Sequence, residues 1–108
     1  MPARSLSYAA TAVLEAIAQG HQYGFDVIAV SGLASGTVYP ALRRLEDAGY
    51  VQSRWEDHRV AQREVRPARK YYEVTGSGQE ALTAALLRYR PMGRRRRASA
   101  RIPRPSRA

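Results

Sequence analysis

The chain has 108 residues, which is enough for one small domain with a modest core. It contains no cysteine, which excludes a disulfide framework, a thiolate metal site and a cysteine nucleophile. The formal net charge is +9, and the sequence shows neither a signal peptide nor a run of about 18 apolar residues. We therefore expect a soluble cytoplasmic protein.

The positive charge is distributed unevenly along the chain. Seven arginines and no acidic residue follow Pro91, so residues 1–90 keep 11 of the 18 basic residues and all nine acidic ones. Residues 91–108 lack periodicity, and we predict a basic tail that is disordered in isolation. Its arginines either add non-specific affinity for DNA or only increase solubility.

Residues 6–19 predict a first helix in which nearly every side chain is apolar or small. Its polar residues Thr11, Glu15 and Gln19 fall on one narrow stripe, whereas a surface helix normally has a wide polar face. We therefore expect the helix to be covered on two sides. The domain's own core covers one side, and a partner subunit is a candidate for the other.

Residues 23–30 and 35–48 predict two further helices. Between them Gly32 lies in a tight turn, where glycine adopts a positive φ without steric penalty. Two helices joined by a short glycine-containing turn form a helix-turn-helix. The first of the two offers three apolar side chains for burial: Phe25, Val27 and Ile28.

Residues 50–56 and 70–74 predict the two strands of a hairpin, because their side chains alternate with period two. The connection of residues 57–68 is long and rich in arginine, and such a loop is more often functional than incidental. We expect Trp55 to lie opposite Tyr72 and to pack in the core or in an interface. The alternative is that Trp55 stacks on a flat ligand in a cavity at a dimer interface.

A last helix starts at a Thr75 or Ser77 cap and reaches about residue 90, where Pro91 ends it. Its apolar stripe packs either against the chain itself or against a partner subunit. The stripe consists of Leu82, Ala85, Leu86 and Tyr89.

The helix of residues 35–48 has the features of a recognition helix, which enters the major groove of DNA by its N-terminal end. Pro40 removes the helical hydrogen bond to Gly36, which indicates a position where function overrides helix propensity. The alternatives are that the polar side chains only cap and pack the helix, and that its arginines form a solvated face paired with Glu46 and Asp47. The expected DNA contacts are Ser35, Gly36, Thr37, Tyr39, Arg43 and Arg44.

Cationic side chains in and beside the hairpin connection are candidates for contacts with the DNA backbone. Such contacts position a protein and make binding salt-dependent, but they do not read sequence by themselves. The alternative is ordinary surface charge. The candidates are Arg59, Arg63, Arg66, Arg69 and Lys70.

Four segments together resemble the PadR-like transcriptional regulators: residues 23–26 (YGFD), 35–46 (SGTVYPALRRLE), 53–56 (SRWE) and 69–75 (RKYYEVT). The resemblance covers roughly residues 6–90. It implies a winged helix-turn-helix that is mainly α with a small antiparallel β-hairpin and has a C-terminal dimerisation helix. The implied domains are a DNA-binding domain (residues 1–75), the dimerisation helix (76–90) and the basic tail (91–108). The implied dimer contacts are Tyr8, Leu82, Ala85, Leu86 and Tyr89.

We therefore expect a homodimeric repressor that binds double-stranded DNA at an inverted repeat, with a small-molecule effector left open. We expect no cofactor, no metal and no enzymatic activity, because His21 and His58 are far apart and no serine has a credible base. Two alternatives remain at this stage. One is a winged-helix module that binds a protein, and the other is a nucleic-acid binder driven mainly by the tail.

Overall fold

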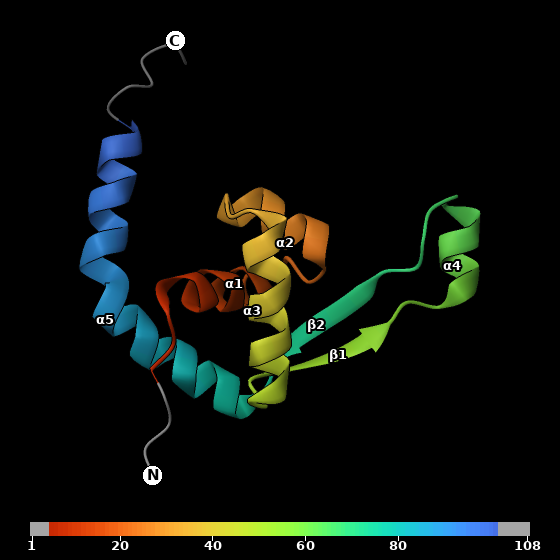
Figure 1. Cartoon of the computed structure of the whole chain (residues 1–108), viewed down its shortest axis with the longest axis horizontal. Coiled ribbons are helices and arrows are strands. Elements are labelled where there is room, and N and C mark those ends of the chain that lie inside the picture. Colours follow the sequence, from red (N-terminus) through yellow and green to blue (C-terminus); the bar gives the residue numbers. More distant parts are fainter. Residues whose placement is uncertain (1–4, 102–108) are drawn as a thin grey trace.

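The computed structural model describes the backbone of residues 5–101 and the side chains of residues 5–89. Its elements follow in the order α1 (Tyr8–Ala18), α2 (Gly24–Ser31), α3 (Ser35–Asp47), β1 (Val51–Trp55), α4 (His58–Arg63), β2 (Lys70–Val74) and α5 (Gly76–Arg101). In Figure 1, α1, α2 and α3 cluster together, and the hairpin of β1 and β2 projects from them with α4 at its far end. The predicted fold, mainly helical with one antiparallel hairpin, is confirmed.

Helix α1 lies at the centre of the fold. The Ser7 side chain caps its N-terminus by accepting a hydrogen bond of 3.0 Å from the Ala10 N–H. Val13 and Leu14 are completely buried. The helix packs against α2, α3, α5 and β2, so elements of the chain itself cover its apolar surface on several sides. In this structure, the unusually apolar pattern of α1 is explained without a partner subunit.

Helices α2 and α3 form the predicted helix-turn-helix. Gly32 ends α2 in the left-handed conformation, with a φ of 73°, as expected for the turn. The two helices are bent by 119° at the break between them. Phe25 is 76% exposed, so the expectation that it is buried is wrong. It follows the buried Gly24 by about 100° around the helix and therefore points away from the core.

Strands β1 and β2 pair with Ser53 opposite Tyr72 and with Trp55 opposite Lys70. The prediction that Trp55 lies opposite Tyr72 is therefore wrong by two residues, because a long connection does not fix the register of a hairpin. The Ser53 hydroxyl donates a 2.5 Å hydrogen bond to Glu46, which ties this face of the hairpin to α3.

The hairpin connection is not a loop throughout, because it contains helix α4. The Asp57 carboxylate caps this helix by accepting a 2.8 Å hydrogen bond from the Arg59 N–H. Ala61 is buried. A helix of six residues is too short to produce a periodic pattern, so the sequence does not reveal it.

Helix α5 begins at a Thr75 cap, whose hydroxyl accepts a 3.1 Å hydrogen bond from the Gly78 N–H. The prediction that Pro91 ends the helix is wrong, because the helical backbone continues to Arg101. An internal proline removes only one helical hydrogen bond and usually kinks the helix. Figure 1 shows that α5 changes direction between its two halves. The backbone of residues 91–101, at the start of the basic tail, is therefore helical, and residues 102–108 lie outside the described part.

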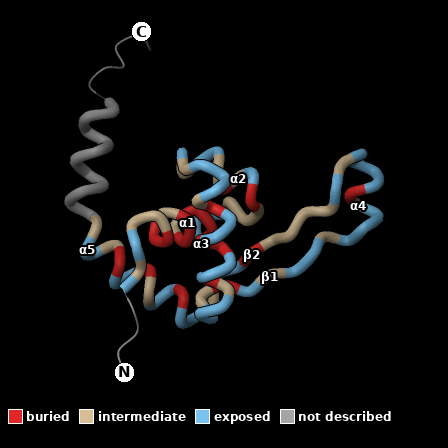
Figure 2. The backbone as a smooth tube through the Cα atoms, in the orientation of Figure 1, coloured by how far each residue is buried: buried red, intermediate tan, exposed pale blue. Residues whose placement is uncertain are grey.

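The buried residues gather where α1, α3 and the start of α5 meet, whereas most of β1 and α4 is exposed and most of β2 is of intermediate burial (Figure 2). Leu82 of α5 belongs to the same core as Leu14 of α1 and Leu42 of α3. Among residues 5–101, no single helix is long and apolar enough to cross a membrane. Only α2 and α3 taken together, across their bend, reach the required length and composition.

Candidate nucleic-acid interface

Helix α3 divides cleanly into an inner and an outer face. The inner face is apolar and buried, and it consists of Val38, Ala41, Leu42 and Leu45. The outer face carries most of the predicted DNA contacts. Thr37 is half-buried, and the exposed members are Ser35, Gly36, Tyr39, Arg43 and Arg44.

The N-terminus of α3 is open to a ligand. Its N-cap residue, Ala34, has no side-chain oxygen and provides no cap for the first N–H groups of the helix. Such groups attract anions such as phosphate. Pro40 lies inside the helix, as predicted, and is exposed on the outer face.

Tyr39 is the aromatic residue of the outer face, and its ring rests on the start of α2. A Cβ added to Gly24 would lie 2.5 Å from the Tyr39 hydroxyl oxygen, so only glycine at this position allows the observed ring placement. Tyr39 is still 44% exposed. It is therefore both seated on the helix-turn-helix and accessible from outside.

The predicted wing cations fall into two groups. Arg59 and Arg63 lie on α4 and are exposed, and Arg59 forms only a solvent-exposed ion pair of 3.2 Å with Asp57. Hydrogen bonds from Arg59 lower the pKa of Asp57. Arg66, Arg69 and Lys70 lie at the base of the wing, where they contact other side chains of the chain. The first group is the more available for a DNA backbone.

Glu56 organises the base of the wing. Its carboxylate accepts two hydrogen bonds from the Arg66 guanidinium, at 2.7 and 2.8 Å, and one of 3.2 Å from the Arg69 N–H. The Glu56 side chain is only 7% exposed. The hydrogen bonds from Arg66, reinforced by that from the Arg69 backbone, lower the pKa of Glu56 to about 2 against the opposing effect of burial. Because Arg66 is bound to Glu56, it is less available for DNA than the sequence predicts.

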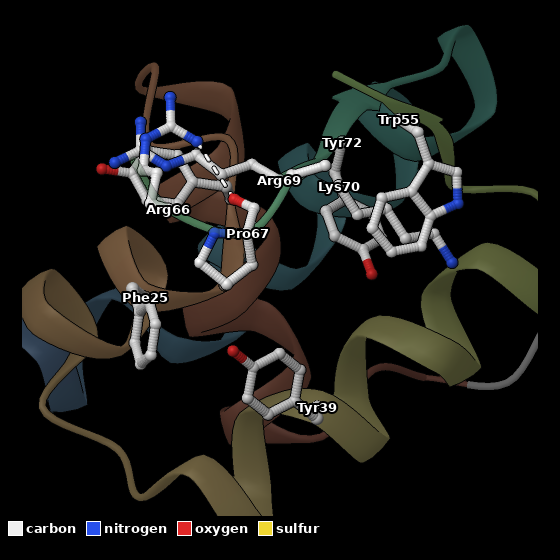
Figure 3. Close-up of a pocket in the computed structure, with 11 residues that line it drawn as sticks. Phe25, Tyr39, Trp55, Arg66, Pro67, Arg69, Lys70 and Tyr72 are labelled. Carbon is white, nitrogen blue, oxygen red and sulfur yellow. Dashed lines mark hydrogen bonds between the residues drawn. The ribbon is translucent and has the colours of Figure 1, made fainter. Parts of the chain in front are cut away.

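Arg69, Lys70 and Trp55 lie between the wing and the helix-turn-helix. The Arg69 guanidinium carbon lies 4.0 Å from the centre of the Tyr23 ring. Lys70 lies 3.6 Å from a carboxylate oxygen of Glu46 and 5.9 Å from the centre of the Trp55 ring. Trp55 is 65% exposed, so it does not pack in the core of its own chain, and it lines a cavity between the hairpin and the helix-turn-helix (Figure 3).

The predicted dimer residues contact the chain itself. Leu82 and Ala85 are 3% and 2% exposed and belong to the protomer's own interior, which leaves them no surface for a partner. Tyr89 stacks edge-on against Tyr8, with ring centres 5.4 Å apart, and donates a 3.0 Å hydrogen bond to the Leu6 carbonyl. Within residues 76–89, the part of α5 whose side chains are described, the exposed large apolar residue is Leu87, at 67%.

Some residues of interest do not stand out in the sequence. Glu56 is one of several acids in an arginine-rich segment, and its role depends on hydrogen-bond geometry. Phe25, the single phenylalanine of the chain, shows in the sequence only as an apolar residue available for burial, and its exposure depends on how α2 packs. His21 pairs with Asp26 at 3.0 Å, yet no group of three metal-ligating residues occurs within the described part of the chain.

A helix-turn-helix with an outward polar face on its second helix, followed by a β-hairpin, defines the winged-helix class of DNA-binding transcription regulators. The sequence profile of the Transcriptional regulator PadR-like family matches residues 13–84. The chain therefore belongs to the PadR-like family of transcriptional regulators, as the resemblance predicted. No curated protein sequence gives a significant match.

Solved structures share this fold. A PadR family transcription regulator from Clostridium difficile R20291 has a TM-score of 0.67 at 22% identity, over 82% of this chain and 93% of that one. A transcriptional regulator from Clostridium thermocellum has a TM-score of 0.63 at 22% identity, over 81% and 84%. BpsR from Bordetella bronchiseptica, whose DNA binding is regulated by 6-hydroxynicotinic acid, has a TM-score of 0.61 at 18% identity, over 85% and 64%. The first two of these structures are named as transcription regulators.

Proposed function

We propose that the protein is a cytoplasmic, sequence-specific repressor that binds an inverted-repeat operator as a homodimer. Each subunit inserts the N-terminal half of α3 into a major groove and lays its wing along the flanking backbone. Two-fold symmetry then requires half-sites about 10 base pairs, or a multiple of that spacing, apart.

The outward face of α3 is the observation that carries this proposal. Tyr39 and Arg43 are exposed there on a helix whose opposite face is held in the core. Small residues at the N-terminal end, Ser35 and Gly36, allow a close approach to base edges. A protein-docking role would favour an apolar outer face, which α3 lacks.

The wing supports the proposal through charge and position. Arg59 and Arg63 lie on α4, which is carried at the far end of the hairpin (Figure 1). Exposed arginines there suit phosphate contacts, which add affinity for any sequence.

The test compares substitutions on the outer face of α3 with substitutions of arginines on α4. We expect Arg43→Ala or Tyr39→Ala to lower affinity for a duplex selected from a random pool by about 5- to 100-fold, with little effect on a scrambled duplex. Arg59→Ala or Arg63→Ala removes the same charge but should weaken both duplexes alike and reduce the salt slope by about 0.9. Fluorescence anisotropy at several salt concentrations measures both quantities.

Arg59 on α4 serves as the charge-matched control for Arg43. If Arg43→Ala and Arg59→Ala weaken selected and scrambled duplexes by the same factors, α3 does not read sequence and the groove assignment is wrong.

Leu87 provides the test of the dimer. Leu87 and Ala84 are exposed on α5, on the side away from the core residues Leu82 and Ala85. We expect wild-type protein to sediment at twice the 12.0 kDa chain mass, and Leu87→Glu to shift it towards the monomer. Val30→Glu, at an exposed apolar site on α2, is the matched control and should stay dimeric. A monomeric wild type at micromolar concentration contradicts the dimer.

A further inference from the structure

Helix α4 ends with a left-handed residue that is not glycine. Its C-cap residue is Glu64, and Val65 follows with a φ of 55°. The Val65 N–H donates a 3.1 Å hydrogen bond to the Gln62 carbonyl. The next N–H, that of Arg66, donates one of 3.2 Å to the Ala61 carbonyl. These two hydrogen bonds define a Schellman motif, whose left-handed position is usually occupied by glycine.

The other helix ends in this chain do place glycine at the left-handed position. Helices α1, α2 and α3 are each followed, within two residues, by a glycine with a positive φ: Gly20, Gly32 and Gly49. Among the described residues, Val65 is the only residue other than glycine with a positive φ. A β-branched side chain is an outlier in this conformation, because its Cβ crowds the following carbonyl. Position 65 therefore carries backbone strain that glycine would relieve.

Packing against the described part of the chain does not offset this strain. The Val65 side chain is 88% exposed, the highest value among the large apolar residues that the structure describes. A buried valine stabilises a fold by removing apolar surface from water, whereas a valine this exposed contributes almost nothing. A position that is both strained and exposed breaks a local folding rule without a gain inside the chain, which indicates a role in binding.

The surroundings of Val65 suit a nucleic acid. Val65 directly follows α4, which lies at the far end of the hairpin (Figure 1). Residues 54–70 carry six cationic and three acidic side chains, so this segment is positive overall. Arg63 is exposed, and it forms no ion pair among the side chains that the structure describes. A cation suited to a phosphate therefore lies two residues from an apolar side chain that has no polar atom.

We propose that Val65 contacts the floor of the minor groove beside each half-site and makes the wing prefer A·T over G·C base pairs there. This role rests on the proposed function, in which α3 occupies the major groove and the wing lies on the flanking DNA. In the minor groove an A·T pair presents only acceptors, whereas a G·C pair adds the 2-amino donor of guanine. An apolar side chain that covers this amino group leaves its hydrogen bond unmade, which disfavours G·C.

The test of this preference uses the full chain and a duplex selected from a random pool. The base pairs that flank each half-site are set in turn to A·T, G·C and inosine·C, because inosine lacks the 2-amino group but keeps the major-groove edge of guanine. We expect wild-type protein to bind the A·T and inosine·C flanks about fivefold more tightly than the G·C flanks. Equal Kd values for the G·C and inosine·C flanks would overturn recognition in the minor groove.

Substitutions at position 65 assign the preference to one side chain. Val65→Ala should remove the preference for A·T flanks without changing the charge of the wing. Val65→Ile keeps a branched apolar side chain and should retain the preference. Val30→Ala makes the same truncation at an exposed valine of α2, so it is the matched control and should also retain the preference. A preference that survives in Val65→Ala shows that Val65 does not contact the flanking base pairs.

The strain at position 65 is measured without DNA. Val65→Gly removes both the strain and the apolar side chain, so we expect its urea midpoint to rise by about 0.5 M while its preference for A·T flanks is lost. This opposition between stability and specificity is the signature of a residue retained for binding. An unchanged or lower urea midpoint contradicts the strain at position 65.

Failure of the proposed function and failure of the role of Val65 give different results. If wild-type protein prefers no duplex over a scrambled one, the proposed function fails, and the role of Val65 fails with it. If a selected duplex binds specifically and Arg43→Ala lowers its affinity, but the flanking base pairs make no difference, the role of Val65 fails alone.

Discussion

Gly78→Ala is expected to lower the free energy of unfolding by about 2 to 3 kcal/mol, a large fraction of the stability of a domain this small. Gly78 is buried in the first turn of α5, and a Cβ there would overlap the backbone carbonyl oxygen of Tyr50. That carbonyl accepts a 3.0 Å hydrogen bond from the Thr75 N–H, so it moves only if this bond weakens. Urea unfolding followed by circular dichroism measures the loss.

Gly76→Ala is the matched control for this substitution. It lies two residues away at the start of the same helix, is exposed, and has open space where the Cβ would stand. The better helix propensity of alanine should leave its stability unchanged or raised by about 0.5 kcal/mol. Equal urea midpoints for the two variants would show that α5 does not pack on the Tyr50 turn as described.

Glu56→Gln is expected to change the pH dependence of stability. The pKa of Glu56 is lowered from 4.5 to about 2 in the folded protein by the hydrogen bonds from Arg66. A lowered carboxyl pKa contributes stability that is present above pH 4.5 and is lost as the pH falls towards 2. Stability of the wild type should therefore decrease across this interval, and Glu56→Gln should make the decrease smaller. Asp57, whose pKa is also lowered, acts in the same direction.

The same substitution should loosen the wing. Glu56 joins the end of β1 to residues 66 and 69, so its loss releases the two ends of the segment that carries α4. We expect faster amide hydrogen exchange over residues 58–65 at neutral pH. Glu73→Gln removes an exposed carboxylate that forms no ion pair among the described residues, and it should alter neither measurement. Unchanged exchange in Glu56→Gln would contradict the role of Glu56.

The elements that the sequence predicts correctly have strong local signals. The helix-turn-helix is marked by helical periodicity and by Gly32, and the strands are marked by alternation. Helix α4 is missed because one and a half turns carry no usable period. The continuation of α5 is missed because a proline in the sequence usually marks the end of a helix, although a single proline removes only one hydrogen bond and bends the helix.

The candidate site is predictable only in part. The face of α3 that turns outward follows from the buried spacing of Val38, Leu42 and Leu45. An apolar stripe, however, does not reveal what covers it, so the sequence leaves open whether Leu82 and Ala85 face a partner, whereas in the structure both are buried within the chain. Whether Arg66 is free to bind DNA depends on its hydrogen bonds with Glu56, ten residues earlier in the chain, and no local sequence pattern indicates this pairing.

Gly24 can influence the sequence preference of α3 without contacting DNA itself. Because the Tyr39 ring rests on the bare backbone of Gly24, any larger residue at that position would push the ring to a new orientation. Under the proposed mode of binding, a substitution at position 24, outside the recognition helix, would therefore change the operator preference. Libraries that vary positions 24 and 39 together would include ring orientations that neither single substitution allows.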